Sequence, residues 1–241
     1  MENEDENTKN TAKQPIFNLP NIIIALLIII WLPQIFISFF PNENLKQLLI
    51  IYFGFIPTRF ITPEQFPLGS LALTWTIFTH ALLHAGWEHL FINSAWLMIF
   101  GTPVARRYGV SAFLLIFFLS AAAGALLFAL VTLPELSLLV GASGGIAGLT
   151  GVAIRFMFQP IQVTKHPETG EVIVLGRSLA SFVEMWSNRT TRYFTIVWLA
   201  LNAAIPLAGI FGFAEINIAW QAHIGGFLLG LFIAPLFERR D

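Results

Sequence analysis

The chain has 241 residues, of which 56% are hydrophobic and 11% are charged, less than half of the roughly 25% that is usual in soluble domains. This composition excludes a water-soluble globule and indicates a protein that lies mostly in lipid. The net charge of −1 argues against a nucleic-acid partner, and the absence of cysteine excludes disulfides and thiolate chemistry.

Aspartate occurs only at Asp5 and Asp241, near the two ends of the chain. No aspartate can therefore lie within a membrane. This distribution excludes an intramembrane aspartyl protease, which needs two aspartates, and a serine triad whose third member is aspartate.

Residues 1–15 are polar and acidic without apolar periodicity, so we expect a disordered cytoplasmic tail. The apolar run Ile22–Phe40 follows, and it is too long for a secretory signal, which favours a retained transmembrane helix. Leu45–Ile56 is only twelve residues long and is closed by Pro57, so an interfacial or half-inserted helix is expected. The further runs of membrane length are Trp87–Ala105, Ala112–Leu133, Ala142–Phe158, Tyr193–Phe213 and Ala219–Phe237.

These runs predict an all-α membrane protein, a six-transmembrane-helix bundle that forms one domain over residues 16–241. Lys and Arg predict its orientation, because short loops rich in them stay cytoplasmic. With both termini in the cytoplasm, only Lys46 and Arg59 lie on the outer side. The eleven basic residues then on the cytoplasmic side are Lys9, Lys13, Arg106, Arg107, Arg155, Lys165, Arg177, Arg189, Arg192, Arg239 and Arg240.

The longest cytoplasmic loop, residues 159–192, has two strand-like runs around a turn signal at residues 167–170, Pro-Glu-Thr-Gly. This pattern predicts a small hairpin, and the amphipathic stretch Leu179–Trp186 follows it. We expect His166, beside the turn, to be a solvated loop residue, and we assign no chemistry to this loop.

Polar groups within membrane helices are candidates for function because burying them is unfavourable. Ser143 lies in the segment Gly141-Ala142-Ser143-Gly144-Gly145, at the predicted start of a helix. A serine there is accessible and lies where the helix N-terminus favours negative charge, as a nucleophile with an oxyanion site requires. The alternative is close helix packing by small residues, with Gly144 and Gly148 as the pair.

His223 shares a helical face with Gly226 and Gly230, so a neighbouring helix can approach closely. It could act as a general base toward Ser143. It could equally bond a carbonyl group and hold two helices together.

His89 and Asn93 are four residues apart, so they lie on one helical face. Both can donate hydrogen bonds to a developing oxyanion. Polar contacts between helices are the alternative explanation.

Three stretches together resemble the rhomboid intramembrane serine proteases. They are residues 75–93, W-T-I-F-T-H-A-L-L-H-A-G-W-E-H-L-F-I-N, residues 141–144, G-A-S-G, and residues 222–226, A-H-I-G-G. The resemblance also covers the six-helix layout and the outer-loop stretch Phe55–Phe60, and it spans residues 20–237.

The resemblance implies a catalytic dyad of Ser143 and His223 without a third acid and without a cofactor. It implies that His89, Asn93 and the backbone N–H of Ser143 hold the oxyanion. His80 and His84 match supporting positions near the active site, and Gly141 and Gly144 belong to the serine motif. The implied substrates are single-span membrane proteins in the lipid bilayer, which are cut near the outer membrane face.

Two positions depart from the pattern of the family. Thr76 follows Trp75 where many members carry arginine, and Ala147 stands where many carry an aromatic residue that stacks on the catalytic histidine. Either another ring among the 24 phenylalanines then supports His223, or its orientation is looser and the activity is lower. The N-terminus lacks a basic, acid-poor transit segment, which favours a prokaryotic plasma membrane as the location.

Two other functions are compatible with parts of the sequence. His80, His84 and His89 could form a metal site together with His223, although no H-E-x-x-H motif is present. A protein that binds transmembrane helices without cutting them is the second alternative. Labelling of Ser143 by a fluorophosphonate distinguishes this binder from a protease.

Overall fold

A computed structural model describes residues 18–210 and 218–238, with the backbone alone described for residues 205–210. The tail predicted for residues 1–15 lies outside these residues. The helices and strands are α1 (Asn21–Phe39), α2 (Glu43–Phe53), α3 (Leu73–Thr79), α4 (Trp87–Trp96), α5 (Thr102–Thr132), α6 (Ser143–Ile154), β1 (Ile161–Lys165), β2 (Val172–Arg177), α7 (Phe182–Ser187), α8 (Arg189–Ile210) and α9 (Trp220–Ile233). Short 3₁₀ turns lie at Pro57–Phe60, Pro63–Gln65, Gly69–Ala72, His80–Leu82 and Ala234–Phe237, and a π turn at Leu97–Gly101 joins α4 to α5.

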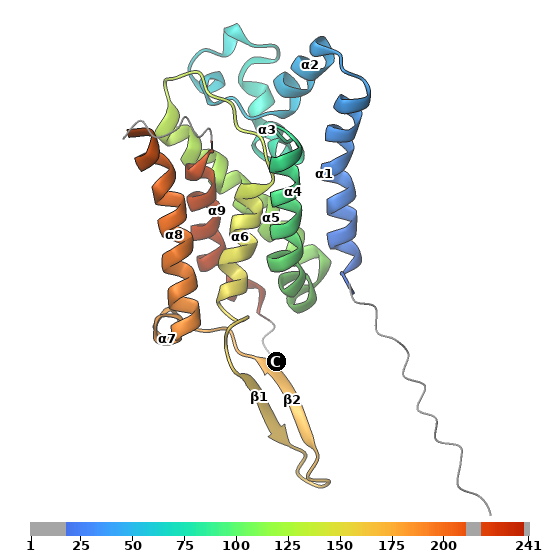
Figure 1. Ribbon diagram of the computed structural model, residues 1–241, viewed down its shortest axis with the longest axis vertical. Helices are drawn as coiled ribbons and strands as arrows, with labels where there is room; N and C mark the ends of the chain where they lie inside the picture. Colours follow the sequence, from blue (N-terminus) through green and yellow to red (C-terminus); the bar gives the residue numbers. More distant parts are fainter. Residues whose placement is uncertain (1–17, 211–217, 239–241) are drawn as a thin grey trace, which may run out of the picture.

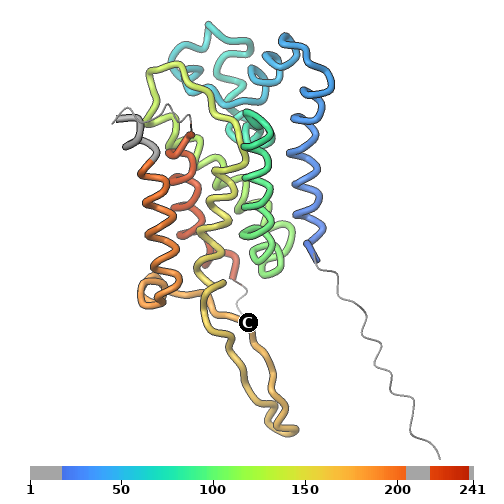
Figure 2. Tube along the Cα trace, viewed as in Figure 1, coloured from blue at the N-terminus to red at the C-terminus, as the bar shows by residue number. Residues whose placement is uncertain are grey.

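The long helices run side by side, with α1 at the edge of the bundle next to α4 (Figures 1 and 2). Among the described residues, three helical stretches are long and apolar enough to cross a membrane: Asn21–Phe39, Trp87–Thr132 and Trp220–Phe237. The second is interrupted at Gly109, whose φ of 78° and ψ of −179° are not helical. A positive φ is readily adopted only by glycine, so the chain turns there between the two spans predicted for this stretch.

Helix α6 is shorter than the predicted span Ala142–Phe158. Its 12 residues extend about 18 Å, well below the roughly 30 Å of a bilayer core. Every residue after Ser143 in this helix is buried, and α6 packs closely against α5 and α9. The backbones of α6 and α9 touch, because a Cβ on Gly226 would collide with the carbonyl of Gly144. The predicted packing of small residues is therefore present.

At one end of the bundle, α2 and the 3₁₀ turns form the segment 41–86. The side chain of Asn42 caps α2 by accepting hydrogen bonds from two backbone N–H groups. Arg59 is wholly buried and donates to the carbonyls of Ile51 (2.6 Å), Pro67 (2.8 Å) and Gly69 (3.2 Å). The predicted short helix is confirmed as α2, and Arg59 holds the turns that follow it.

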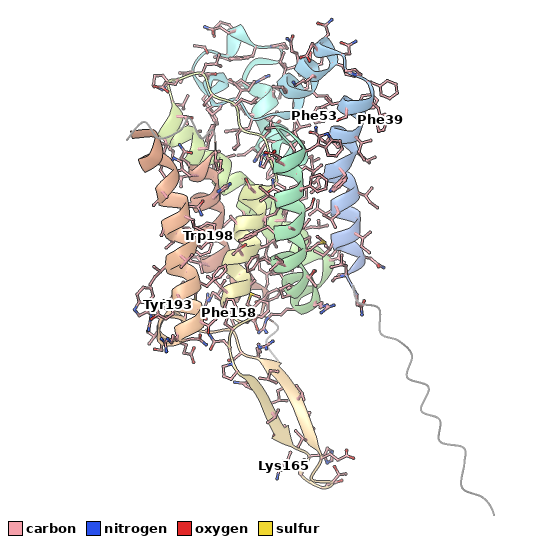
Figure 3. All side chains as sticks on the ribbon, viewed as in Figure 1. Phe39, Phe53, Phe158, Lys165, Tyr193 and Trp198 are labelled. Carbon is pink, nitrogen blue, oxygen red and sulfur yellow. The ribbon has the colours of Figure 1, made fainter. Side chains whose placement is uncertain are left out.

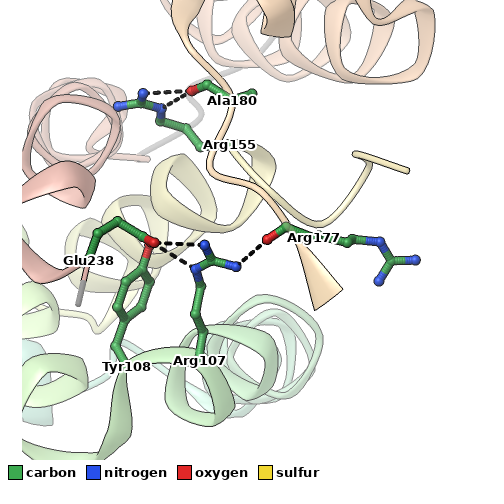
Figure 4. A network of polar contacts seen from close by, with 6 residues as sticks. All are labelled: Arg107, Tyr108, Arg155, Arg177, Ala180 and Glu238. Carbon is green, nitrogen blue, oxygen red and sulfur yellow. Dashed lines mark hydrogen bonds and ion pairs between the residues drawn. The ribbon is translucent and has the colours of Figure 1, made fainter. Parts of the chain in front are cut away.

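The opposite end carries the hairpin of β1 and β2, whose turn includes residues 167–170 as predicted. The hairpin is tied to the bundle through Arg107, which donates to the carbonyl of Arg177 (2.7 Å) and to the carboxylate of Glu238 (2.8 Å) (Figure 4). Tyr108 donates to the same carboxylate at 2.6 Å. These bonds join the start of α5, the hairpin and the residue that follows the 3₁₀ turn Ala234–Phe237.

The two ends of the bundle also separate the basic residues. The start of α1, the break in α5, the hairpin and the start of α8 lie at one end, and α2 lies at the other (Figure 1). Figure 3 shows Lys165 at the far tip of the hairpin, with Phe39 and Phe53 at the opposite end. The described Lys and Arg residues therefore lie at the two ends as predicted, whereas Lys9, Lys13, Arg239 and Arg240 lie outside the described residues.

Candidate active site

Ser143 is the first residue of α6, and the chain before it is tied to the segment 41–86. Leu139 and Phe55 exchange backbone hydrogen bonds of 2.9 and 3.1 Å, and the N–H of Gly141 donates to the carbonyl of His80 at 2.9 Å. Gly141 has a φ of +126°, which places it in a conformation that suits glycine. Its neighbours thus fix where α6 begins, inside the bundle.

His89 and Ser143 lie on either side of the space above Gly141. A Cβ added to Gly141 would lie 2.6 Å from the Cε1 atom of His89 and 3.7 Å from the Oγ atom of Ser143. Glycine at position 141 therefore leaves room for the imidazole beside the serine. The ring of His89 also meets the ring of His84 edge to face, at 5.1 Å between centroids.

A pocket of about 180 Å³ brings together residues from four helices. Ser143 from α6, His223 from α9 and Asn93 from α4 all line it, although they are far apart in the sequence. No hydrogen bond joins Ser143 to His223 in the described chain. The pocket residues are Ile92, Asn93, Trp96, Ser143, Ala147, Trp198, Asn202 and His223.

Asn93 is buried, with 4% of its surface exposed, and its Nδ2 atom has no hydrogen-bond partner among the described residues. A buried amide donor without a partner is unfavourable unless a ligand or water accepts its hydrogen bond. The Nδ2 group is therefore available to an acceptor in the pocket, next to Ser143.

His80 and His84 are not among the residues that line this pocket. Nδ1 of His80 is 3.0 Å from the carbonyl oxygen of Thr76, and burial lowers the pKa of His80 to about 4. Neither ring nitrogen of His84 has a partner among the described residues, and burial, followed by the nearby His89, lowers its pKa to about 3. Both rings are therefore neutral at neutral pH.

The alternative metal site would need at least three ligating side chains close together. Within residues 18–210 and 218–238, no group of three His, Asp or Glu side chains could hold a metal ion. The proposed cluster of His80, His84 and His89 is thus not assembled as a ligand set in this structure.

Asn202 on α8 also lines the pocket, and it is not among the site residues that were predicted from the sequence. Its Oδ1 atom is 2.8 Å from Nδ1 of His223, the closest polar contact of that ring. One turn away, Trp198 stacks on Phe227 with 4.2 Å between centroids, and Figure 3 shows Trp198 midway along the bundle. Asn202 could have been found in the sequence, because it is the one amide in the apolar run Ile196–Ile210.

Comparisons with known proteins agree with the resemblance in the motifs. A family model described as Rhomboid domain matches residues 72–240. Rhomboid-like protease 1 of Toxoplasma gondii is 25% identical over 232 residues, which are 93% of this chain and 66% of that protein. Rhomboid protease GluP of Bacillus subtilis is 32% identical over 160 residues, 66% of this chain and 25% of that protein.

Rhomboid protease GlpG of Pectobacterium atrosepticum is 29% identical over 166 residues, which are 69% of this chain and 49% of that protein. The chain thus spans between a quarter and two thirds of the length of these three relatives.

Proposed function

This chain belongs to the rhomboid family, and from that membership we propose that it is an intramembrane serine endopeptidase with a dyad of Ser143 and His223. The relatives that it matches are named as rhomboid proteases. The observation that carries the proposal is the pocket, in which a serine hydroxyl, an imidazole and an unpartnered amide donor lie together.

In the proposed reaction, Nε2 of His223 takes the proton of the Ser143 hydroxyl while Oγ attacks the carbonyl carbon of the scissile peptide bond. The imidazolium then gives this proton to the leaving amine, and water hydrolyses the acyl-enzyme by the same steps. The absence of a Ser143–His223 hydrogen bond is compatible with this role, since such bonds often tighten only when substrate binds.

The oxyanion is held by donors that converge on the start of α6. Nδ2 of Asn93 is buried without a partner, the ring of His89 borders Gly141, and the N–H of Ser143 belongs to the first turn, where N–H groups have no partner within the helix. Donors arranged in advance stabilise the charge that develops in the transition state.

The substrates that we propose are single-span membrane proteins, cut near the outer membrane face. Ile92 and Trp96 line the pocket from α4 and are 64% and 37% exposed, so the pocket borders the outer surface of the bundle. A substrate segment can therefore enter from the lipid. The small pocket favours a small side chain at the cleavage site.

We further propose that residues 16–241 form one six-span domain in a prokaryotic plasma membrane, with both termini in the cytoplasm. The location of the basic segments at the hairpin end supports this orientation. Ser143 would then lie toward the outer half of the bilayer, because α6 starts at the end of the helix that points away from the hairpin.

The test is cleavage of a single-span substrate, together with fluorophosphonate labelling, by the full chain in lipid vesicles. Ser143→Ala should remove both activities and leave the protein folded, since alanine is smaller and the hydroxyl supplies the nucleophile. His223→Ala should abolish cleavage too. Ser120→Ala is the matched control. It also removes a buried serine hydroxyl that has no hydrogen-bond partner among the described residues, but Ser120 does not line the pocket. Cleavage that survives Ser143→Ala would exclude the proposed mechanism.

A further inference from the structure

The polar contacts of Asn202 determine which way its side-chain amide faces. Asn202 is 7% exposed, its Nδ2 is 2.9 Å from the carbonyl oxygen of Trp198, and its Oδ1 is 2.8 Å from Nδ1 of His223. A backbone carbonyl only accepts hydrogen bonds, so the atom that faces Trp198 must be the NH₂ group. The atom that faces His223 must then be the amide oxygen.

The amide oxygen in turn determines the tautomer of His223. An amide oxygen cannot donate, so the contact at 2.8 Å is a hydrogen bond only when Nδ1 of His223 carries the proton. A neutral imidazole has one N–H group, so Nε2 is left with its lone pair. This is the nitrogen that a general base must present to a serine hydroxyl.

The packing around this pair also restrains the ring. Asn202 and Trp198 are one turn apart on α8, and His223 and Phe227 are one turn apart on α9. Helices α8 and α9 are therefore joined at two successive turns, by the stack of Trp198 on Phe227 and by the hydrogen bond from Nδ1 of His223 to Oδ1 of Asn202. Ala147, which lines the same pocket, contributes only a methyl group.

We propose that Asn202 is a positioning residue for His223, which holds the imidazole in the Nδ1–H tautomer with Nε2 free to accept the proton of Ser143. This role rests on the proposed function, in which His223 is the base. Asn202 acts through the ring of His223, with which its Oδ1 atom makes its contact. Asn202 on α8 is thus a third polar residue beside Ser143 and His223, in a chain whose aspartates lie only at its ends.

The kinetic test compares three substitutions of Asn202 in the full chain in lipid vesicles. Asn202→Leu keeps the branched shape of the side chain but removes the acceptor, and it should lower kcat about 10–100-fold with little change in KM, which is part of the 10²–10⁴-fold that a general base supplies. Asn202→Ala should behave similarly. Asn202→Asp restores an oxygen acceptor and should retain more kcat than Asn202→Leu. If Asn202 served packing alone, Asn202→Leu would retain more kcat than Asn202→Asp, because leucine packs without burying a polar group.

Thr195→Ala is the matched control on the same helix. Thr195 donates from Oγ1 to the carbonyl of Thr191 at 2.8 Å, just as Asn202 donates from Nδ2 to the carbonyl four residues earlier. Thr195→Ala therefore removes an equivalent bond to the helix backbone without touching His223, and kcat should not change.

The ¹⁵N resonances of His223 provide a readout that does not depend on activity. In the unsubstituted chain at neutral pH they should show a protonated Nδ1 and an unprotonated Nε2, and Asn202→Leu should move population to the Nε2–H form. A protonated Nε2 in the unsubstituted chain, or an unchanged kcat in Asn202→Leu, would overturn the proposal. A chain that cleaves nothing overturns the proposed function instead, and the resonances then still decide whether Asn202 holds this tautomer.

Discussion

Two neighbouring residues on α4 differ in their polar contacts. Asn93 is directed into the pocket with an unpartnered Nδ2, whereas the next residue, Ser94, accepts a hydrogen bond of 2.9 Å from Nε1 of Trp31 on α1. The sequence analysis left two roles open for Asn93, as an oxyanion donor or as a polar contact between helices. In the described structure the interhelical contact is made by Ser94.

Asn93→Ala should lower kcat by less than the 10²–10³-fold that is typical of losing a main oxyanion donor, because His89 and the N–H of Ser143 share the charge. The fluorophosphonate should still label the variant, but more slowly, since Ser143 and His223 remain. Single-turnover cleavage and labelling rates measure both effects. Full activity with reduced thermal stability would show that Asn93 only holds helices together.

Ser94→Ala should give the opposite result at the adjacent position. It removes the hydrogen bond to Trp31, and polar contacts between membrane helices contribute about 0.6 kcal/mol on average. We expect a small decrease in unfolding temperature in detergent and an unchanged cleavage rate. A loss of activity as large as that of Asn93→Ala would mean that the position of α4, rather than a specific donor, limits catalysis.

At the scale of elements, the segment 41–86 is held by one buried cation. Arg59 donates to three carbonyls that belong to the end of α2 and to the turns after it, and its guanidinium lies 5.1 Å from the centroid of the Phe66 ring. At Thr76 the chain lacks an arginine that many members of the family carry. The arginine that holds the segment 41–86 in this chain is Arg59.

Arg59→Met should therefore destabilise the outer segment strongly. Hydrogen bonds to charged groups contribute about 1.5–3 kcal/mol each, and three partly buried carbonyls would lose their donor, so we expect a loss of at least about 3 kcal/mol. Limited proteolysis within residues 57–72 and thermal unfolding measure this loss. Lys46→Met is the control, because Lys46 forms only an exposed ion pair with Glu43 at 4.0 Å and its loss should change little.

For the whole molecule, the two ends of the bundle predict its topology in the membrane. Reporters fused after Leu68 and after Glu135 should lie outside, and reporters at Lys165 and at the C-terminus should be cytoplasmic, because the basic segments gather at the hairpin end. Alkaline phosphatase and green fluorescent protein fusions distinguish the two sides. An external position for residue 165 would contradict the arrangement.

The contacts of Glu238, at the hairpin end of the bundle, predict how stability depends on pH. Burial alone would raise the pKa of Glu238, but hydrogen bonds from Arg107 and Tyr108 and the charge of Arg107 outweigh burial and lower it. The ionised carboxylate therefore stabilises the fold above the unfolded pKa of about 4.3, and this stabilisation is lost as the pH falls through the lower folded pKa.

Glu238→Gln should accordingly be less stable than the unsubstituted chain at pH 7, with a smaller difference at pH 3. Unfolding temperatures in detergent across this range test the sign. Glu171→Gln, at an exposed position in the hairpin, should follow the unsubstituted chain throughout. A difference between Glu238→Gln and the unsubstituted chain that grows toward low pH would contradict the lowered pKa.

The helical membrane class, the family, the hairpin and the separation of the described basic residues could all be predicted from the sequence. These features depend on the apolar length of each segment, on turn residues and on local motifs, all of which are read along the chain. The family prediction is confirmed, whereas the six spans, their orientation and the roles of the site residues stay proposals.

Only the tertiary structure decided what the site residues meet. Asn202 and His223 are 21 residues apart on different helices. Their contact depends on which face of α8 packs against α9, and no local sequence pattern encodes this. The early end of α6 at Ile154, the three carbonyls around Arg59 and the free donor of Asn93 likewise depend on which helices enclose them. Hydropathy predicts which segments lie in the membrane. Which side chains are buried within the protein, and which polar groups they contact, depends on the helices that pack around them.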